Sequence, residues 1–153
     1  MCIKGQGKLV FMWICLIFAL APSSCAAPRP LGLPFSVSQV EKIELYRFVI
    51  PAQARKKTIS EAGGIQWIYG VLAEAEAADN TLEPESGAQV TSFRFCLSEG
   101  SSFEMAYISH EGKTGELKGK NINYQTTEDV SRLWDGFSDE EETPASVSEL
   151  PAI

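Results

Sequence analysis

Apolar side chains recur every three to four positions within residues 58–78, which is the spacing of one face of a helix. Thr58 and Glu61 fit a capping box, in which a hydroxyl and a carboxylate each accept a hydrogen bond from a backbone N–H. The sequence therefore predicts a core helix over residues 58–78 that packs against a sheet. Its apolar stripe consists of Ile65, Trp67, Ile68, Val71, Leu72 and Ala75.

β-Branched and aromatic residues gather in shorter runs on either side of this helix, as they do in strands. The predicted strands cover residues 40–50, 89–98, 103–110 and 115–124. The second and third are expected to form a hairpin with six large apolar side chains on one face. The register of the last strand stays open, because Ile122 and Tyr124 have the wrong parity unless a bulge intervenes. The predicted hairpin pairs are Leu97 with Phe103, Phe95 with Met105, Phe93 with Tyr107, and Cys96 with Glu104.

A second amphipathic segment, residues 128–136, follows Thr126 and Thr127, either of which can cap a helix. The predicted order is thus β-α-β-β-β-α. This is an α+β fold with an antiparallel meander sheet and two helices packed on one face. The other face of an antiparallel sheet can remain in water, so we expect any binding function there.

The two ends of the chain differ in composition from its centre. Residues 1–26 combine two lysines, a 13-residue apolar run and small residues, which is typical of an export signal, since a membrane span needs about 20 apolar residues. Residues 27–37 are proline-rich and predict an extended tether. Residues 38–137 form the predicted single α+β domain, and the acidic residues 138–153 are predicted to be disordered.

Cys25 lies just behind the apolar run, after Ser23 and Ser24. This resembles a bacterial lipoprotein signal, in which such a cysteine becomes the lipid-modified first residue. The alternative is ordinary cleavage after Ala26. If Cys25 remains a thiol, it can pair with Cys96, and the sequence leaves these possibilities open.

The net charge of the chain and the small number of its histidines and cysteines narrow the classes of function that it can have. Removal of residues 1–26 leaves 11 basic and 20 acidic residues, a formal charge of −9. That balance argues against nucleic acid as a partner, which needs a positive field. One histidine and two cysteines beyond the apolar run are too few for a four-ligand zinc site. We expect no cofactor and no bound metal.

Three side chains are candidates for a binding face on the sheet: Arg94, Glu104 and His110. An alternative function is a small hydrolase in which His110 acts with Ser109 or Cys96, since a nucleophile needs an adjacent base. Another alternative is a secreted inhibitor that inserts the loop of residues 99–102 into the cleft of an enzyme.

The strand IELYRFVI, the helix TISEAGGIQWIYGVL, the meander and the closing DVSRLW resemble small bacterial lipoprotein domains of unknown function, of the YhfM-like kind, over roughly residues 38–137. The resemblance implies a bacterial cell-envelope location and no known catalytic residues. The sequence predicts an exported or lipid-anchored, non-enzymatic module. It would bind an unknown protein or small ligand at the cell surface, and would contact the membrane through a lipid anchor if Cys25 is modified.

Overall fold

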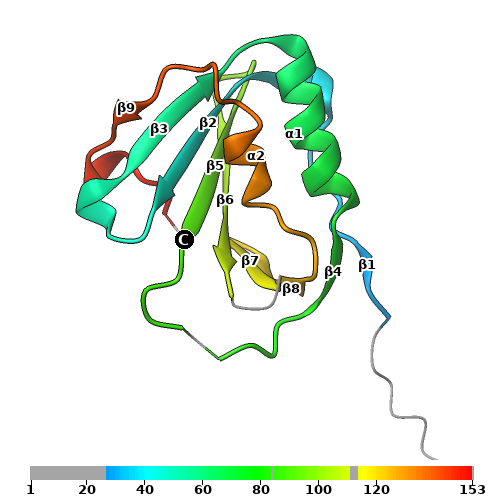
Figure 1. The fold of residues 1–153 in the computed structure, drawn as a ribbon. Coiled ribbons are helices and arrows are strands. Elements are labelled where there is room, and N and C mark those ends of the chain that lie inside the picture. Colours follow the sequence, from blue (N-terminus) through cyan, green and yellow to red (C-terminus); the bar gives the residue numbers. More distant parts are fainter. Residues whose placement is uncertain (1–26, 84, 111–113, 153) are drawn as a thin grey trace, which may run out of the picture.

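The computed structural model describes residues 27–83, 85–110 and 114–152. Within these ranges the protein is α+β, as the sequence predicts. Nine antiparallel strands form a single sheet in the order β1-β4-β8-β7-β6-β5-β2-β3-β9, and two α-helices lie on one side of it (Figure 1). The elements are β1 (Arg29–Pro30), β2 (Val40–Phe48), β3 (Arg55–Ile59), α1 (Ala62–Glu74), β4 (Glu76–Asp79), β5 (Val90–Leu97), β6 (Ser102–Ser109), β7 (Gly115–Gly119), β8 (Ile122–Thr126), α2 (Arg132–Asp135) and β9 (Thr143–Pro144), with 3₁₀ turns at Val37–Gln39, Pro51–Gln53 and Val147–Glu149.

The predicted hairpin of β5 and β6 exists, but its register was wrong by two residues. Phe95 lies opposite Phe103, and Arg94 lies opposite Glu104. A two-residue shift keeps every side chain on its predicted face, because strand side chains alternate with a period of two. The apolar faces therefore agree with the sequence pattern, whereas the cross-strand neighbours do not.

The predicted strand over residues 115–124 is two strands, β7 and β8, which pair as a second hairpin. Gly119 pairs with Ile122, so the turn consists of Lys120 and Asn121. This turn accounts for the parity of Ile122 and Tyr124 without a bulge, because the chain reverses before it reaches them. The element order of the structure is accordingly richer in strands than the predicted β-α-β-β-β-α.

The predicted capping box at Thr58 was wrong. Thr58 belongs to β3, which pairs with β2, and α1 begins only at Ala62. Glu61 is itself the N-cap residue, and its carboxylate accepts a hydrogen bond of 2.7 Å from the Gly64 N–H. Gly64 is required here because a β-carbon would clash with Ile59 and Phe137. Thr58 and Ile59, which the sequence pattern places in the first turn of the helix, belong instead to β3.

Helices α1 and α2 share one apolar core with the same face of the sheet, as predicted. Lys57 on β3 is only 4% exposed and reaches this core. Its Nζ donates hydrogen bonds to the carbonyl oxygens of Trp134 (3.2 Å) and Phe137 (2.8 Å), which ties α2 to β3. The fully buried core side chains include Ile43, Leu45, Ile59, Ile68, Leu72, Phe93, Phe95, Met105, Leu117, Val130 and Leu133.

Residues 27–39, here called the N-terminal segment, are not a free tether. Arg29 and Pro30 form β1, which pairs with β4, and Phe35 is 9% exposed in the main core. The ring of Phe35 packs against Phe95 and Phe103, with centroid distances of 5.2 Å in each case. The sequence prediction of an unpacked tether was therefore wrong for these residues.

Residues 143–152, here called the C-terminal segment, are ordered rather than disordered as the acidic composition had predicted. Thr143 and Pro144 form β9 on the open edge of β3. Ala145 is buried with Tyr46 and Ala54 in a second apolar cluster, on the sheet face opposite the helices. That face is therefore partly covered (Figure 1), and not wholly open to water.

Among the described residues, no helix is both long enough and apolar enough to cross a bilayer.

Candidate functional site

Arg94, the first predicted binding residue, lies at the centre of a polar cluster on the sheet face opposite the helices. Its guanidinium donates to Glu104 Oε1 at 2.6 Å and to Glu44 Oε2 at 3.1 Å. It also donates to the Tyr46 hydroxyl at 2.7 Å and to the backbone oxygen of Glu149 at 2.8 Å. These contacts engage its three guanidinium nitrogens.

Burial and hydrogen bonds together set the pKa values of the acidic groups in this cluster. Burial by itself raises the pKa of Glu44, but hydrogen bonds from Lys42, Tyr46 and Arg94 outweigh it and lower that pKa to about 2. Burial and the bond to Glu44 raise the pKa of Tyr46. Glu44 is therefore a fixed carboxylate, and Tyr46 a fixed phenol, throughout the neutral range.

The C-terminal segment covers this cluster. The Ala152 N–H donates to Glu104 Oε2 at 3.1 Å, and Lys56 pairs with Glu149 at 3.1 Å. Arg94 and Glu104 are thus brought together, but they are used within the molecule. The acidic segment, which was predicted to be free, partly covers the face on which we expected a partner. That Arg94 and Glu104 bind a partner stays a prediction.

His110, the third predicted residue, lies at the far end of β6 from Glu104. Its Nε2 is 2.9 Å from Glu116 Oε1, and its Nδ1 is 3.0 Å from Glu85 Oε2. Glu116 is 2% exposed and also accepts from Lys118 and Asn80. Burial raises the pKa of Glu116, but the bonds from Lys118, Asn80 and His110 outweigh it and lower that pKa.

The pairing of His110 with Cys96, considered for a hydrolase, is not assembled. Cys96 pairs with Ser102 at one end of β6, whereas His110 follows the other end. Both ring nitrogens of His110 lie within hydrogen-bond distance of carboxylates. Among the described residues, no three or more histidine, cysteine, aspartate or glutamate side chains are grouped to hold a metal ion.

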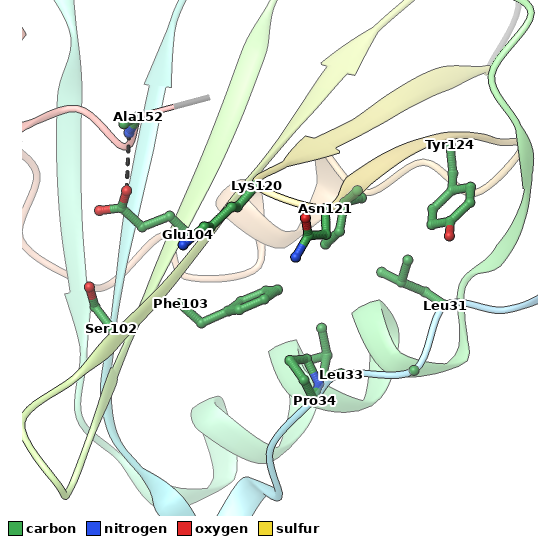
Figure 2. A pocket seen from close by; sticks show the side chains of 12 residues that line it. Leu31, Leu33, Pro34, Ser102, Phe103, Glu104, Lys120, Asn121, Tyr124 and Ala152 are labelled. Carbon is green, nitrogen blue, oxygen red and sulfur yellow. Dashed lines mark hydrogen bonds between the residues drawn. The ribbon is translucent and has the colours of Figure 1, made fainter.

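A groove of about 880 Å³ lies beside the Arg94 cluster, where β6 runs past the end of β7. Figure 2 shows its three walls: residues 31–34, the first residues of β6, and the turn between β7 and β8. Glu104 belongs to both sites, since its carboxylate faces Arg94 and its backbone borders the groove. The groove is lined by Leu31, Gly32, Leu33, Pro34, Ser102, Phe103, Glu104, Lys120, Asn121, Ile122, Tyr124 and Ala152.

The lining of the groove divides into an apolar floor and a polar rim. Leu31, Leu33, Phe103 and Ile122 supply the floor, and all four also pack against the main core. On the rim, both carboxylate oxygens of Glu104 already have partners. Lys120 forms no ion pair with any described residue. The unpaired charge of the groove is therefore positive.

Sequence reasoning missed most of this groove. Leu31, Leu33 and Pro34 were assigned to a tether, and Lys120 to the interior of a single strand. One signal was present, since Leu31, Leu33 and Phe35 alternate with other residues as strand residues do. Cys25 lies outside the described residues, so its lipidation and its pairing with Cys96 remain predictions.

No family model, no curated protein and no solved structure matches this chain.

Proposed function

We propose that this chain is an exported, non-enzymatic binding module that captures its ligand in the groove between residues 31–34, the start of β6 and the β7–β8 turn. The observation that carries the proposal is the groove itself. Its volume, about 880 Å³, falls within the range of small-ligand sites, and such sites combine an apolar lining with a few placed polar groups.

The ligand is a molecule with an apolar body and an anionic end. Leu31, Leu33, Phe103 and Ile122 favour an apolar body because its burial removes apolar surface from water on both sides. Lys120 favours an anionic end, since it is the rim cation without an ion-pair partner among the described residues. The remainder of the chain is acidic, so the protein as a whole does not attract anions. The positive charge of Lys120 therefore contributes to the choice between anionic and neutral ligands more than to the rate at which anions arrive.

The site of action belongs to the same proposal. Residues 1–26 carry the composition of an export signal, and Cys25 is the residue to which a lipid would be attached. The module would then act outside the cytoplasm at a bacterial membrane. The intact mass of the mature protein tests this. A diacyl or triacyl mass on a chain that begins at Cys25 is expected, and an unmodified chain in the medium would contradict the anchor.

The binding experiment uses 8-anilinonaphthalene-1-sulfonate, which has an apolar body and an anionic end. Its fluorescence should rise saturably with the protein. Asn121→Trp should abolish the rise, because Asn121 lies at the exposed turn on the groove rim and an indole there fills the groove. Lys120→Gln should weaken binding several-fold.

Arg132→Gln is the matched control. Arg132 is 56% exposed on α2, away from the groove, and forms only a 3.9 Å contact with Glu128. Its removal should leave binding unchanged, and circular dichroism should confirm that all variants remain folded. Fluorescence that is unaltered by Asn121→Trp, or that never saturates, would contradict the proposal.

A further inference from the structure

Strand β6 has an open edge inside the groove. On one side it pairs with β5 as far as Ser102, opposite Cys96. On the other side its pairing with β7 ends at Met105, opposite Gly119. In the part of the chain that the structure describes, no strand pairs with residues 102–104 on that second side.

The backbone of these residues directs hydrogen-bonding groups into the groove. In antiparallel pairs the residues bonded to one neighbour alternate along the strand with those bonded to the other. Leu97 donates to the Ser101 carbonyl at 2.9 Å, so odd-numbered residues of this hairpin bond toward β5. His110 donates to the Thr114 carbonyl at 2.9 Å, so even-numbered residues bond toward β7. Ser102 therefore turns its N–H and C=O groups toward the side that lacks a strand. Glu104, which faces Lys120 in this register, turns its N–H the same way, whereas its carbonyl oxygen lies against Gly119.

The side chains around this edge match the needs of an added strand. The floor residues Leu31, Leu33 and Phe103 can receive alternate side chains of an extended segment. Lys120, the first residue of the β7–β8 turn, borders the groove (Figure 2). Its charge complements an acidic residue on that segment.

From these observations we propose that the groove takes a peptide segment, which binds in extended conformation as an added strand on β6 beside Ser102 and Glu104. The peptide carries apolar residues at alternate positions and an acidic residue near Lys120. This inference rests on the proposed function and names the ligand class. Strand addition explains an observation that a fatty acid or another small amphiphile does not, namely that no described strand pairs with the backbone groups of Ser102 or with the N–H of Glu104 on this side of β6.

The neighbouring C-terminal segment supports the idea that this sheet accepts such segments. β9 adds to the edge of β3 through only two residues, and Ala145 then donates to the Ala54 carbonyl at 2.9 Å. β1 adds to β4 in the same way at the opposite edge. Short extended segments thus complete this sheet at two edges already, and the groove beside β6 is a third such position.

The test is a selection from a displayed library of random decapeptides against the full folded domain, with the Asn121→Trp variant as counter-selection. Enriched peptides should alternate apolar and polar residues and contain an acidic residue. Lys120→Gln should weaken them at least several-fold, whereas Arg132→Gln should not.

Backbone methylation separates strand addition from simple apolar contact. Methylation of alternate peptide amides in one register removes the N–H groups that face β6, and should reduce affinity at least tenfold. Methylation in the other register alters only outward-facing amides and should leave affinity unchanged. In addition, the amides of Ser102 and Glu104 should exchange with solvent more slowly in the complex.

Three results would overturn the inference. One is that no peptide is enriched over the Asn121→Trp variant. Another is that the two methylation registers weaken binding equally. The third is that bound peptides leave the exchange of Ser102 and Glu104 unchanged. If the naphthalene sulfonate still binds in the groove while peptides fail, the groove is a small-ligand site, and the proposed function survives without this peptide class.

Discussion

The N-terminal and C-terminal segments use the same local device in different surroundings. Each contains a two-residue strand on a sheet edge, followed by a one-turn 3₁₀ helix with the sequence SVSQ or SVSE. In both turns the first serine N–H donates at 2.8 Å to the side chain three residues on, Gln39 or Glu149. The similarity is local. What holds each segment to the domain differs.

The N-terminal segment is held by apolar burial, and the C-terminal segment mainly by charge. Phe35 lies among aromatic rings, and its carbonyl accepts a 2.6 Å hydrogen bond from Tyr69. The equivalent position before the second turn is Ala145, a much smaller side chain. Lys56, Arg94 and Glu104 provide the polar contacts there. One segment should therefore be insensitive to salt and pH, and the other should respond to both.

Phe35→Ala should have the largest effect, a loss of about 3 kcal/mol in the free energy of unfolding, because large-to-small changes of buried aromatics cost about 3–5 kcal/mol. Urea denaturation measures it. Leu150→Ala, which removes a partly buried side chain from the C-terminal segment, should cost only about 1 kcal/mol. Equal losses would show that the two anchors do not differ as described.

Arg94→Met should come next, with a loss of about 2 kcal/mol, since it leaves Glu44 and Glu104 without their shared partner. The value is reduced for the partial exposure of Arg94, 22%. The C-terminal segment should also become more sensitive to protease. Arg132→Met, at an exposed pair on α2, should remain within about 0.5 kcal/mol, and a comparable loss there would contradict the assignment.

Acid should release the C-terminal segment selectively. Hydrogen bonds from Ser146 and the Lys56 ammonium lower the pKa of Glu149 to about 2, and Glu44 also has a pKa of about 2. An unperturbed glutamate has a pKa of about 4.3. Since both folded-state pKa values are depressed, the stabilisation is present above about 4.3 and is lost as the pH falls toward about 2.

Limited proteolysis or amide exchange of residues 143–152, measured from pH 5 to about 2, checks this prediction, and high salt at neutral pH should act in the same direction. Glu149→Gln should remove part of the pH dependence. The amides of the N-terminal segment provide the internal comparison. If these amides lose their protection from exchange at the same pH as those of the C-terminal segment, the difference between the two anchors is not electrostatic.

The smallest effects should come from the two turns themselves. Ser36→Ala and Ser146→Ala each remove the hydrogen bond from the serine hydroxyl to the side chain three residues on, Gln39 or Glu149, which costs roughly 0.5 kcal/mol at an exposed turn. Ser36→Ala should lower global stability, because its turn precedes β2 in the centre of the fold. Ser146→Ala should increase only local opening of the C-terminal segment, which amide exchange resolves from global unfolding. Identical exchange patterns in the two variants would contradict this distinction.

The sequence predicted those parts of the fold that depend on periodicity. The apolar faces of β5 and β6 and most of the apolar stripe of α1 follow from alternation and helical spacing. Trp67, which was assigned to that stripe, is 41% exposed. The register of β5 on β6 could not be read in this way, because a shift of two residues preserves every face. The turn at Lys120 and Asn121 was missed because neither residue is proline or glycine, although Gly119 precedes it.

The two segments were misjudged for a related reason. Prolines in residues 27–37 and acidic residues in 138–153 resemble a tether and a disordered tail by composition. Composition averages over a segment, whereas docking depends on single residues such as Phe35 and Ala145. The groove was missed for the same reason. Half of its apolar floor comes from the segment that was set aside, and its open edge depends on where β7 ends.

The late position of β9 has a consequence for the nascent chain. Until residues 143–144 have been synthesised, β3 is an outer strand with an unpaired edge, and such edges promote association between chains. Arg55, Lys56 and Lys57 are the first three of its five residues. Consecutive lysines and arginines on an edge strand act as gatekeepers against aggregation. The basic run, which in the finished molecule binds the C-terminal segment and α2, would thus protect the same strand while its partner is still on the ribosome.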